Sequence, residues 1–104
     1  MKTKIYQGTE IKYNIHIAPM GNLSMDNYDF IVEFFCNPRK VVALRKERLI
    51  RIDEDNYVAR VDSSALGNGD VKIKITAYIP DNDFDDGIRT EVVCFDTDTV
   101  IYNK

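Results

Sequence analysis

The stretch DVKIKITAYI, residues 70–79, alternates polar and apolar side chains with a period of two. Because successive side chains of a β-strand point to opposite faces, this pattern predicts a strand with one face in a core and the other in solvent. The predicted core positions are Val71, Ile73, Ile75, Ala77 and Ile79. The segment EIKYNIHIA, residues 10–18, repeats the alternation and places Ile11, Tyr13, Ile15 and Ile17 inward. Such strands predict a fold built from half-buried sheets.

The segment DFIVEFFC, residues 29–36, is apolar on both of its predicted faces. One face carries Phe30, Val32, Phe34 and Cys36, and the other carries Ile31 and Phe35 beside Glu33. Large exposed apolar patches usually mark interaction sites. The second face is therefore covered either by the loop MGNLSMDN, residues 20–27, or by another chain.

Short apolar segments separated by turn signals occupy the middle of the chain: KVVALR (40–45), RLIRID (48–53) and NYVARVD (56–62). A helix over residues 41–50 is the competing interpretation, but the β-branched Val41 and Val42 disfavour it. Strands at this spacing predict an all-β fold of about seven to nine short strands, an antiparallel β-sandwich or a small barrel. The 104 residues are the size of a single domain, 1–104.

Charge and segment composition predict a protein without nucleic-acid or membrane partners. The formal net charge is −3, which gives no overall attraction to nucleic acid or to an anionic membrane. The first residues lack the apolar core of a signal peptide, and no apolar run is long enough for a membrane span. We therefore expect synthesis in the cytoplasm. Cys36 and Cys94 lie on predicted strands that can meet across a sandwich, but a reducing compartment favours free thiols.

The run DNDFDD, residues 81–86, contains four aspartates and raises the question of a calcium site. Asp81, Asp83 and Asp85 have the alternate spacing of calcium ligands in a loop, but Gly87 falls one residue late and Val92 stands where the closing glutamate belongs. A solvated hairpin tip, reversed tightly by Asp86-Gly87, fits better. We predict no metal ligands, and weak calcium binding at Asp81–Asp86 stays an open alternative.

Catalytic patterns are also missing from the sequence. Aspartates on one exposed loop do not form the facing carboxylate pair that glycosidases use. His16 lies on the outward face of a predicted strand, and no serine sits in a nucleophile-elbow motif. No dinucleotide, phosphate or cysteine-histidine metal motif is present. We predict no catalytic residues and no cofactor, and therefore a protein that is not an enzyme.

The charges gather at two poles of opposite sign. Seven acids fall between Asp81 and Asp98, opposed there only by Arg89. The basic pole consists of Arg39, Lys40, Arg45, Lys46, Arg48 and Arg51, opposed by Glu47. It lacks the aromatic residues that single-stranded nucleic-acid sites use for stacking, so a solvated face is favoured. Complementary poles of this kind orient head-to-tail or partner contacts.

Residues 56–93 resemble a signature of small structural proteins of phages and prophages of gut bacteria. The shared elements are the Leu-Gly-x-Gly turn at Leu66–Gly69, the strand end at Ala77–Asp81 and the return Asp86–Glu91. More distantly, IYQGTEIKYNIHI, residues 5–17, resembles the opening of the N-terminal sandwich domain of phage baseplate upper proteins. The resemblance implies an immunoglobulin-like sandwich, associated with the virion as a tail, baseplate or head-fibre component, with other virion or tail proteins as partners.

We therefore expect a non-enzymatic assembly module that acts through protein–protein contacts, with a homo-oligomer as one arrangement. The predicted partner-contact residues are Ile31, Phe35, Asp81, Asp83, Phe84, Asp85, Asp86 and Arg89. The rival hypothesis is a ligand- or carbohydrate-binding sandwich in which Tyr78 and Phe84 stack on sugars. The absence of tryptophan, a large amphipathic ring suited to such a platform, weighs against it.

Overall fold

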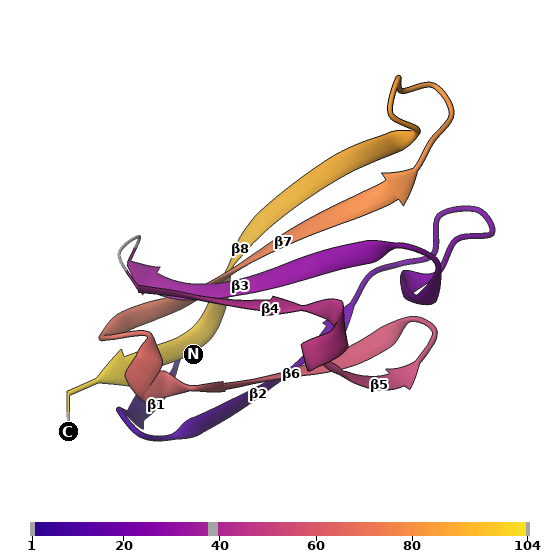
Figure 1. Ribbon diagram of the computed structural model, residues 1–104. Coiled ribbons are helices and arrows are strands. Elements are labelled where there is room, and N and C mark those ends of the chain that lie inside the picture. The colour runs from indigo at the N-terminus through magenta and orange to yellow at the C-terminus, as the bar shows by residue number, and fades with distance from the viewer. Residues whose placement is uncertain (1, 38–39, 104) are drawn as a thin grey trace.

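The computed structural model describes residues 2–37 and 40–103, and they form two layers of β-sheet (Figure 1). The strands are β1 (Thr3–Tyr6), β2 (Glu10–His16), β3 (Asp29–Asn37), β4 (Lys40–Arg45), β5 (Ile50–Asp53), β6 (Asn56–Asp62), β7 (Gly69–Pro80) and β8 (Ile88–Tyr102). Three single-turn 3-10 helices join them: η1 (Met25–Asn27), η2 (Lys46–Arg48) and η3 (Ser63–Ala65). None of the helices in the described ranges is long and apolar enough to cross a membrane.

The strand order is that of an immunoglobulin-like sandwich. The larger sheet has the order β1-β8-β7-β3-β4, and the smaller one has the order β2-β6-β5. In the larger sheet β8, β7, β3 and β4 correspond to strands G, F, C and C′ of immunoglobulin domains. In the smaller sheet β2, β6 and β5 correspond to strands B, E and D. The predicted all-β sandwich is confirmed, and the eight described strands lie within the predicted range.

One pairing departs from the predicted antiparallel arrangement. The short strand β1 pairs in parallel with the end of β8, Thr3 opposite Thr99 and Tyr6 opposite Tyr102. The other paired neighbours in the described part of the chain are antiparallel. An N-terminal strand carries no local signal for its direction against a partner more than ninety residues away, so only the assembled sheet decides it.

The core lies between the two inner faces, where the sequence pattern predicted it. Phe30, Val32 and Phe34 are fully buried, as are the inward positions of β7 except the half-buried Ile75. Phe30 meets the ring of Tyr57 edge-on at 5.4 Å between centroids, and Phe34 stacks on Tyr13 at 5.6 Å. Burying a side chain of this size contributes about 1.5–3 kcal/mol, so these rings are a main source of stability.

The loop of residues 20–27 does not cover the outer face of β3. It turns inward instead: Met25 is fully buried, and Met20 and Leu23 pack against the core. The Lys46 ammonium holds the loop by donating hydrogen bonds to the carbonyl oxygens of Met25, Asp26 and Tyr28 at 2.9, 3.1 and 2.9 Å. The first of the two alternatives for the apolar outer face is therefore wrong.

The cysteines are both free and lie in the same sheet. Cys36 is half-buried, packs against the core and donates to the Gly69 carbonyl, with 3.5 Å between sulfur and oxygen. Cys94 is exposed and lies opposite Lys74, on the outer face. They point to opposite faces of one sheet, so they do not meet across the sandwich.

Candidate functional site

The β7–β8 hairpin extends past the smaller sheet. Figure 1 shows its distal half rising away from the layer of β2, β6 and β5. Its strands are 12 and 15 residues long, and their pairing continues out to Pro80 opposite Ile88. The Tyr13 hydroxyl of β2 donates to the Thr99 hydroxyl at 2.7 Å, so β2 lies over the proximal part of β8. The distal part of β8 lacks this cover.

The uncovered part of β8 exposes apolar side chains on both faces. Val93 and Phe95 lie opposite the core residues Ile75 and Ile73, so they point to the inner face. They are nevertheless 56% and 43% exposed, and Val92 on the outer face is 55% exposed. On the inner face Val93 and Phe95 line an apolar hollow of about 260 Å³, together with Met20 and residues 16–18. The sequence did not identify Val93 and Phe95 as exposed, because apolar residues that alternate along a strand have the same pattern whether or not another sheet covers them.

One edge of the β8 backbone, the edge away from β7, also lacks a partner strand along this segment in the described part of the chain. On the side away from β7, β1 pairs only with residues Thr99–Tyr102. Within the described ranges no strand pairs with the same edge between Ile88 and Asp98. Among the described strands, β2 in the facing sheet pairs only with β6, so its outer edge has no partner strand there either. Unpaired N–H and C=O groups along a strand are a template for adding another strand. We call residues Ile88–Asp98 the open edge.

The hairpin tip is a seven-residue loop rather than the predicted tight Asp-Gly reversal. The Asp81 amide donates to the Gly87 carbonyl at 2.9 Å, and the Gly87 amide donates to the Phe84 carbonyl at 2.9 Å. Two aspartates cap their own backbone: Asp81 accepts from the Asp83 amide at 3.0 Å, and Asp86 accepts from the Ile88 amide at 3.1 Å. Gly87 has a φ of 75°, which explains the glycine at this position.

The aspartates at the tip do not converge. Among the described residues, no three His, Cys, Asp or Glu side chains are grouped so as to hold a metal ion. Oxygens of Asp81 and Asp86 already accept backbone hydrogen bonds. Phe84, 47% exposed, is the large apolar group that the tip presents. The tip therefore presents a charged rim around one aromatic ring.

The predicted contact residues fall into three groups. Asp83, Phe84, Asp85 and Asp86 are exposed at the tip. Arg89 and Asp81 stabilise the hairpin base instead, because the Arg89 guanidinium pairs with Asp81 at 3.8 Å and with Glu91 at 3.6 Å. Ile31 and Phe35 are half-buried on the outer face of β3, opposite Arg45 and Val41 of β4. The sequence therefore grouped residues that the fold separates.

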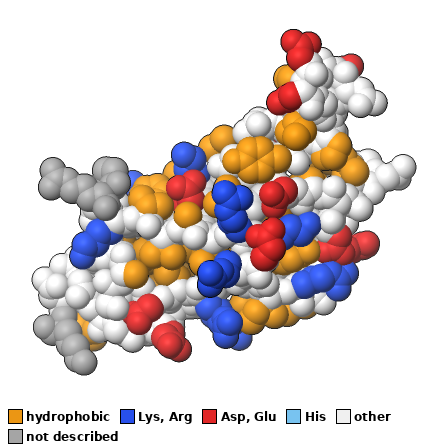
Figure 2. Space-filling model, in the orientation of Figure 1, with side chains coloured by type: hydrophobic (Ala, Val, Ile, Leu, Met, Phe, Trp, Pro, Cys, Tyr) orange, Lys and Arg blue, Asp and Glu red, His pale blue; other side chains and the backbone are white. Residues whose placement is uncertain are grey.

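The basic pole lies on the opposite side of the sandwich, over β4, η2 and β5. Figure 2 shows Lys and Arg side chains gathered in this region among a few acids, whereas the acidic side chains on the projecting tip are aspartates. Lys40, Arg45 and Arg48 are exposed here, together with the apolar Val41 and Ile52. Arg39 lies outside the described residues. β4 is the other edge strand of the larger sheet, so this pole too borders an edge that none of the described strands pairs with.

Two members of the basic pole have structural tasks that the sequence did not reveal. Lys46 holds the loop of residues 20–27, and Arg51 forms a forked contact with Asp26, 2.8 Å between Nη2 and Oδ2. The Arg51 guanidinium, and secondarily the Tyr57 hydroxyl, lower the pKa of Asp26 to about 2. Burial and the hydrogen bond to Asp26 raise the pKa of Tyr57 to about 12. This cluster joins β5, β6 and the loop and is not a free binding site.

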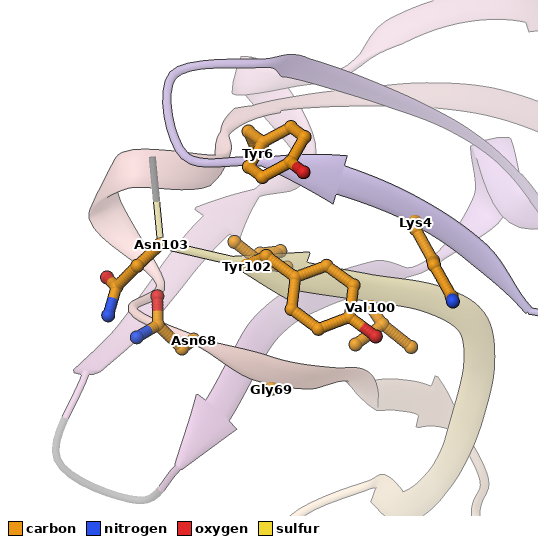
Figure 3. A pocket seen from close by; sticks show the side chains of 8 residues that line it. Lys4, Tyr6, Asn68, Gly69, Val100, Tyr102 and Asn103 are labelled. Atoms are coloured by element: carbon orange, nitrogen blue, oxygen red, sulfur yellow. The ribbon is translucent and has the colours of Figure 1, made fainter.

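A shallow hollow of about 700 Å³ lies at the other end of the molecule (Figure 3). It is formed by β1, the end of β8 and the turn at Asn68 and Gly69. The exposed rings of Tyr6 and Tyr102 lie 6.3 Å apart, and the Lys4 ammonium lies 6.0 Å from the Tyr102 ring. The rival carbohydrate hypothesis had named Tyr78 and Phe84 instead. The two tyrosines come together only through the parallel pairing of β1 with β8.

Comparison with known proteins leaves the fold and these surfaces as the basis for assigning a function. No protein-family model matches the chain, and no curated protein and no solved structure matches it significantly. The residues that can bind another molecule therefore have to be identified from their own exposure, charge and pairing. By these criteria the open edge of β8 is the main candidate site.

Proposed function

We propose that this protein is a non-enzymatic assembly module of a phage or prophage particle, a tail, baseplate or head-fibre component that acts through protein–protein contacts. The observation that carries the proposal is the open edge, where unpaired backbone and exposed apolar side chains coincide. Either feature alone marks an interaction surface. The likeness of residues 56–93 to phage structural proteins supports the place in a particle.

The apolar row is large enough to contribute measurably to binding. Val92, Val93 and Phe95 are 55%, 56% and 43% exposed. Full burial of one such side chain is worth about 1.5–3 kcal/mol, so covering the exposed half of all three is worth roughly 2–4 kcal/mol. Added main-chain hydrogen bonds supply register and further affinity, as in other cases of strand addition. The open edge therefore has the features of a docking site for an extended segment of a partner.

The test is incorporation into particles. Particles purified after induction of a host that encodes the chain should contain it, as detected by mass spectrometry and immunogold labelling. The double variant Val93→Lys/Phe95→Lys places charges on the open edge and should leave the particles without the protein while the isolated domain keeps its fold by circular dichroism. Glu54→Lys, on the exposed turn between β5 and β6, is the control and should be incorporated normally. Particles that lack the wild-type chain would contradict the proposal.

A second candidate function is carbohydrate binding at the hollow of Figure 3. The observation that favours it is the pair of exposed tyrosine rings beside the side-chain amides of Asn68 and Asn103. Aromatic faces and amides are suited to the apolar and polar sides of a sugar ring. Titration with a panel of oligosaccharides should then shift the NMR signals of Tyr6 and Tyr102, and Tyr102→Ala should abolish the shifts. If no sugar shifts these signals, this candidate is excluded.

A further inference from the structure

We infer that the open edge of β8 accepts a second copy of this chain, added head to tail through the β4 edge of that copy. The inference rests on the proposed function and names its partner. The basic and acidic poles, which the sequence left without a role, lie along these two edges.

Strand direction permits this contact, and the twist of the sheet sets the rotation between the two copies. β4 and the open part of β8 are the two edges of one five-stranded sheet, outside the region covered by β1. β4 is antiparallel to β3, β3 to β7, and β7 to β8. β4 therefore runs opposite to β8. A copy moved sideways along the sheet and rotated to follow its twist brings its β4 antiparallel to β8, with the inner faces of both copies on the same side.

Side-chain alternation then selects a register. Residues directly opposite in an antiparallel pair point to the same face. Val42 and Leu44 of β4 are inward, because they lie opposite Phe34 and Val32 of β3. With Val42 of one copy opposite Phe95 of the next, Leu44 falls opposite Val93. The incoming strand thus extends the core face over the two exposed apolar side chains of β8.

The two edges also carry opposite charges, Lys40 and Arg45 on β4 against Glu91, Asp96 and Asp98 on the open edge. In this register Lys40 falls opposite Thr97 and Arg45 falls opposite Val92. Arg45 points to the outer face and Glu91 to the inner face, whereas Lys40 points inward and Asp96 outward. The charges therefore favour the contact by attraction between a basic and an acidic edge, and not by directly opposed ion pairs.

Charge also disfavours the two symmetric alternatives. Two β8 edges facing each other would bring two acidic edges together, each with Glu91, Asp96 and Asp98, and two β4 edges would bring together two basic edges, each with Lys40 and Arg45. Juxtaposed like charges suppress a wrong pairing. Only the pairing of β4 with β8 places a basic edge on an acidic one. The contact is therefore between different surfaces, and such contacts generate rings or helical arrays rather than closed dimers.

The size of the contact indicates weak association in dilute solution. β4 contributes six residues, so the paired area is smaller than the roughly 800 Å² per partner of a standard stable interface. We expect the sedimentation-average mass of the pure protein to increase with concentration, to pass that of a dimer, and to fall with added salt. Salt acts because the charges are exposed and screened.

Charge reversal on each edge tests the pairing directly. Lys40→Glu/Arg45→Glu reverses the β4 edge, and Asp96→Lys/Asp98→Lys reverses the open edge. Each variant alone should associate about tenfold more weakly than the wild type, as expected when two exposed charges become repulsive. An equimolar mixture should regain association, because each reversed edge then meets its opposite. Glu54→Lys should associate like the wild type, and melting curves establish that all variants are folded.

Several outcomes would overturn the inference: a monomer at every concentration, a mass that stops at the dimer, or reversed variants whose mixture does not regain association. These results are separable from failure of the proposed function. If the chain stays monomeric but Val93→Lys/Phe95→Lys still prevents incorporation into particles, the open edge binds another virion protein and only the second-copy inference fails. If self-association occurs but particles lack the chain, the proposed function fails and the pairing of β4 with β8 stands.

Discussion

Lys46 is expected to hold the loop of residues 20–27 in place, and Lys46→Met tests this. Its ammonium donates to the carbonyls of Met25, Asp26 and Tyr28 and lies 5.7 Å and 5.9 Å from the ring centroids of Phe30 and Tyr57. Methionine keeps an unbranched apolar stem of similar length, so packing is largely retained. The variant isolates the loss of the hydrogen bonds and of the charge.

The expected magnitude follows from the burial of the three acceptors. The bond to the Asp26 carbonyl is exposed, and water replaces it at little cost. The bonds to the Met25 and Tyr28 carbonyls are partly buried. Losing a partly buried hydrogen bond from a charged donor costs about 1–2 kcal/mol, which gives a loss of roughly 2–4 kcal/mol in the free energy of unfolding. For a domain of this size the melting temperature should fall by on the order of 10–20 °C.

Urea unfolding followed by far-ultraviolet circular dichroism measures the loss, since the chain has no tryptophan for fluorescence. Hydrogen exchange of the Asn27 amide, which bonds to the Ser24 carbonyl at 3.0 Å, reports on the loop itself and should accelerate. Arg48→Met removes an exposed cation from the same turn and should stay within about 0.5 kcal/mol of the wild type. If Lys46→Met were equally harmless, the assignment of Lys46 to the loop would be refuted.

The other predictions concern pH and the hairpin tip. Because the folded-state pKa of Asp26 is about 2, below its ordinary 3.8, its contribution to stability should be complete above pH 4 and disappear as the pH falls toward 2. Urea midpoints across this range should show less pH dependence in Asp26→Asn. Conversely, the raised pKa of Tyr57, about 12, means that stability should fall as the pH rises above 10, and Tyr57→Phe should remove that loss. At the tip, a Cβ on Gly87 meets no atom within 4 Å, so Gly87→Ala should cost only the backbone strain of a φ of 75°, about 1–2 kcal/mol. Gly87→Asn should cost less, and equal midpoints for the two variants would contradict this explanation.

Local patterns predicted the strands and their faces well. The alternation in residues 70–79 and 10–18 reproduces the inward positions of β7 and β2, because a period of two is a property of the strand itself. The segments at 40–45, 48–53 and 56–62 correspond to β4, β5 and β6 within two residues at each end. The loop of residues 20–27 was not predictable in the same way. The position of this loop depends on Lys46, which lies about twenty residues further along the chain. The sequence indicated only that Lys46 belongs to a solvated basic face.

The candidate site was predicted only in part. Phe84 and its neighbouring aspartates are exposed at the tip, as the sequence indicated. Val93 and Phe95 were missed, since an apolar alternation has the same appearance whether or not another sheet covers it. Their exposure follows from the position of β2 over the proximal part of β8 alone.

The sequence by itself therefore determined that this is a β-sandwich, which side chains face its core, and that its charge is divided between two poles. These properties depend on near neighbours along the chain. Only the tertiary structure decided that β8 keeps an unpaired edge, that Tyr6 and Tyr102 come together, and that the two poles border opposite edges of one sheet. Each of these depends on which strands lie side by side, and strand pairing joins residues far apart in the chain through backbone hydrogen bonds that carry no local signature.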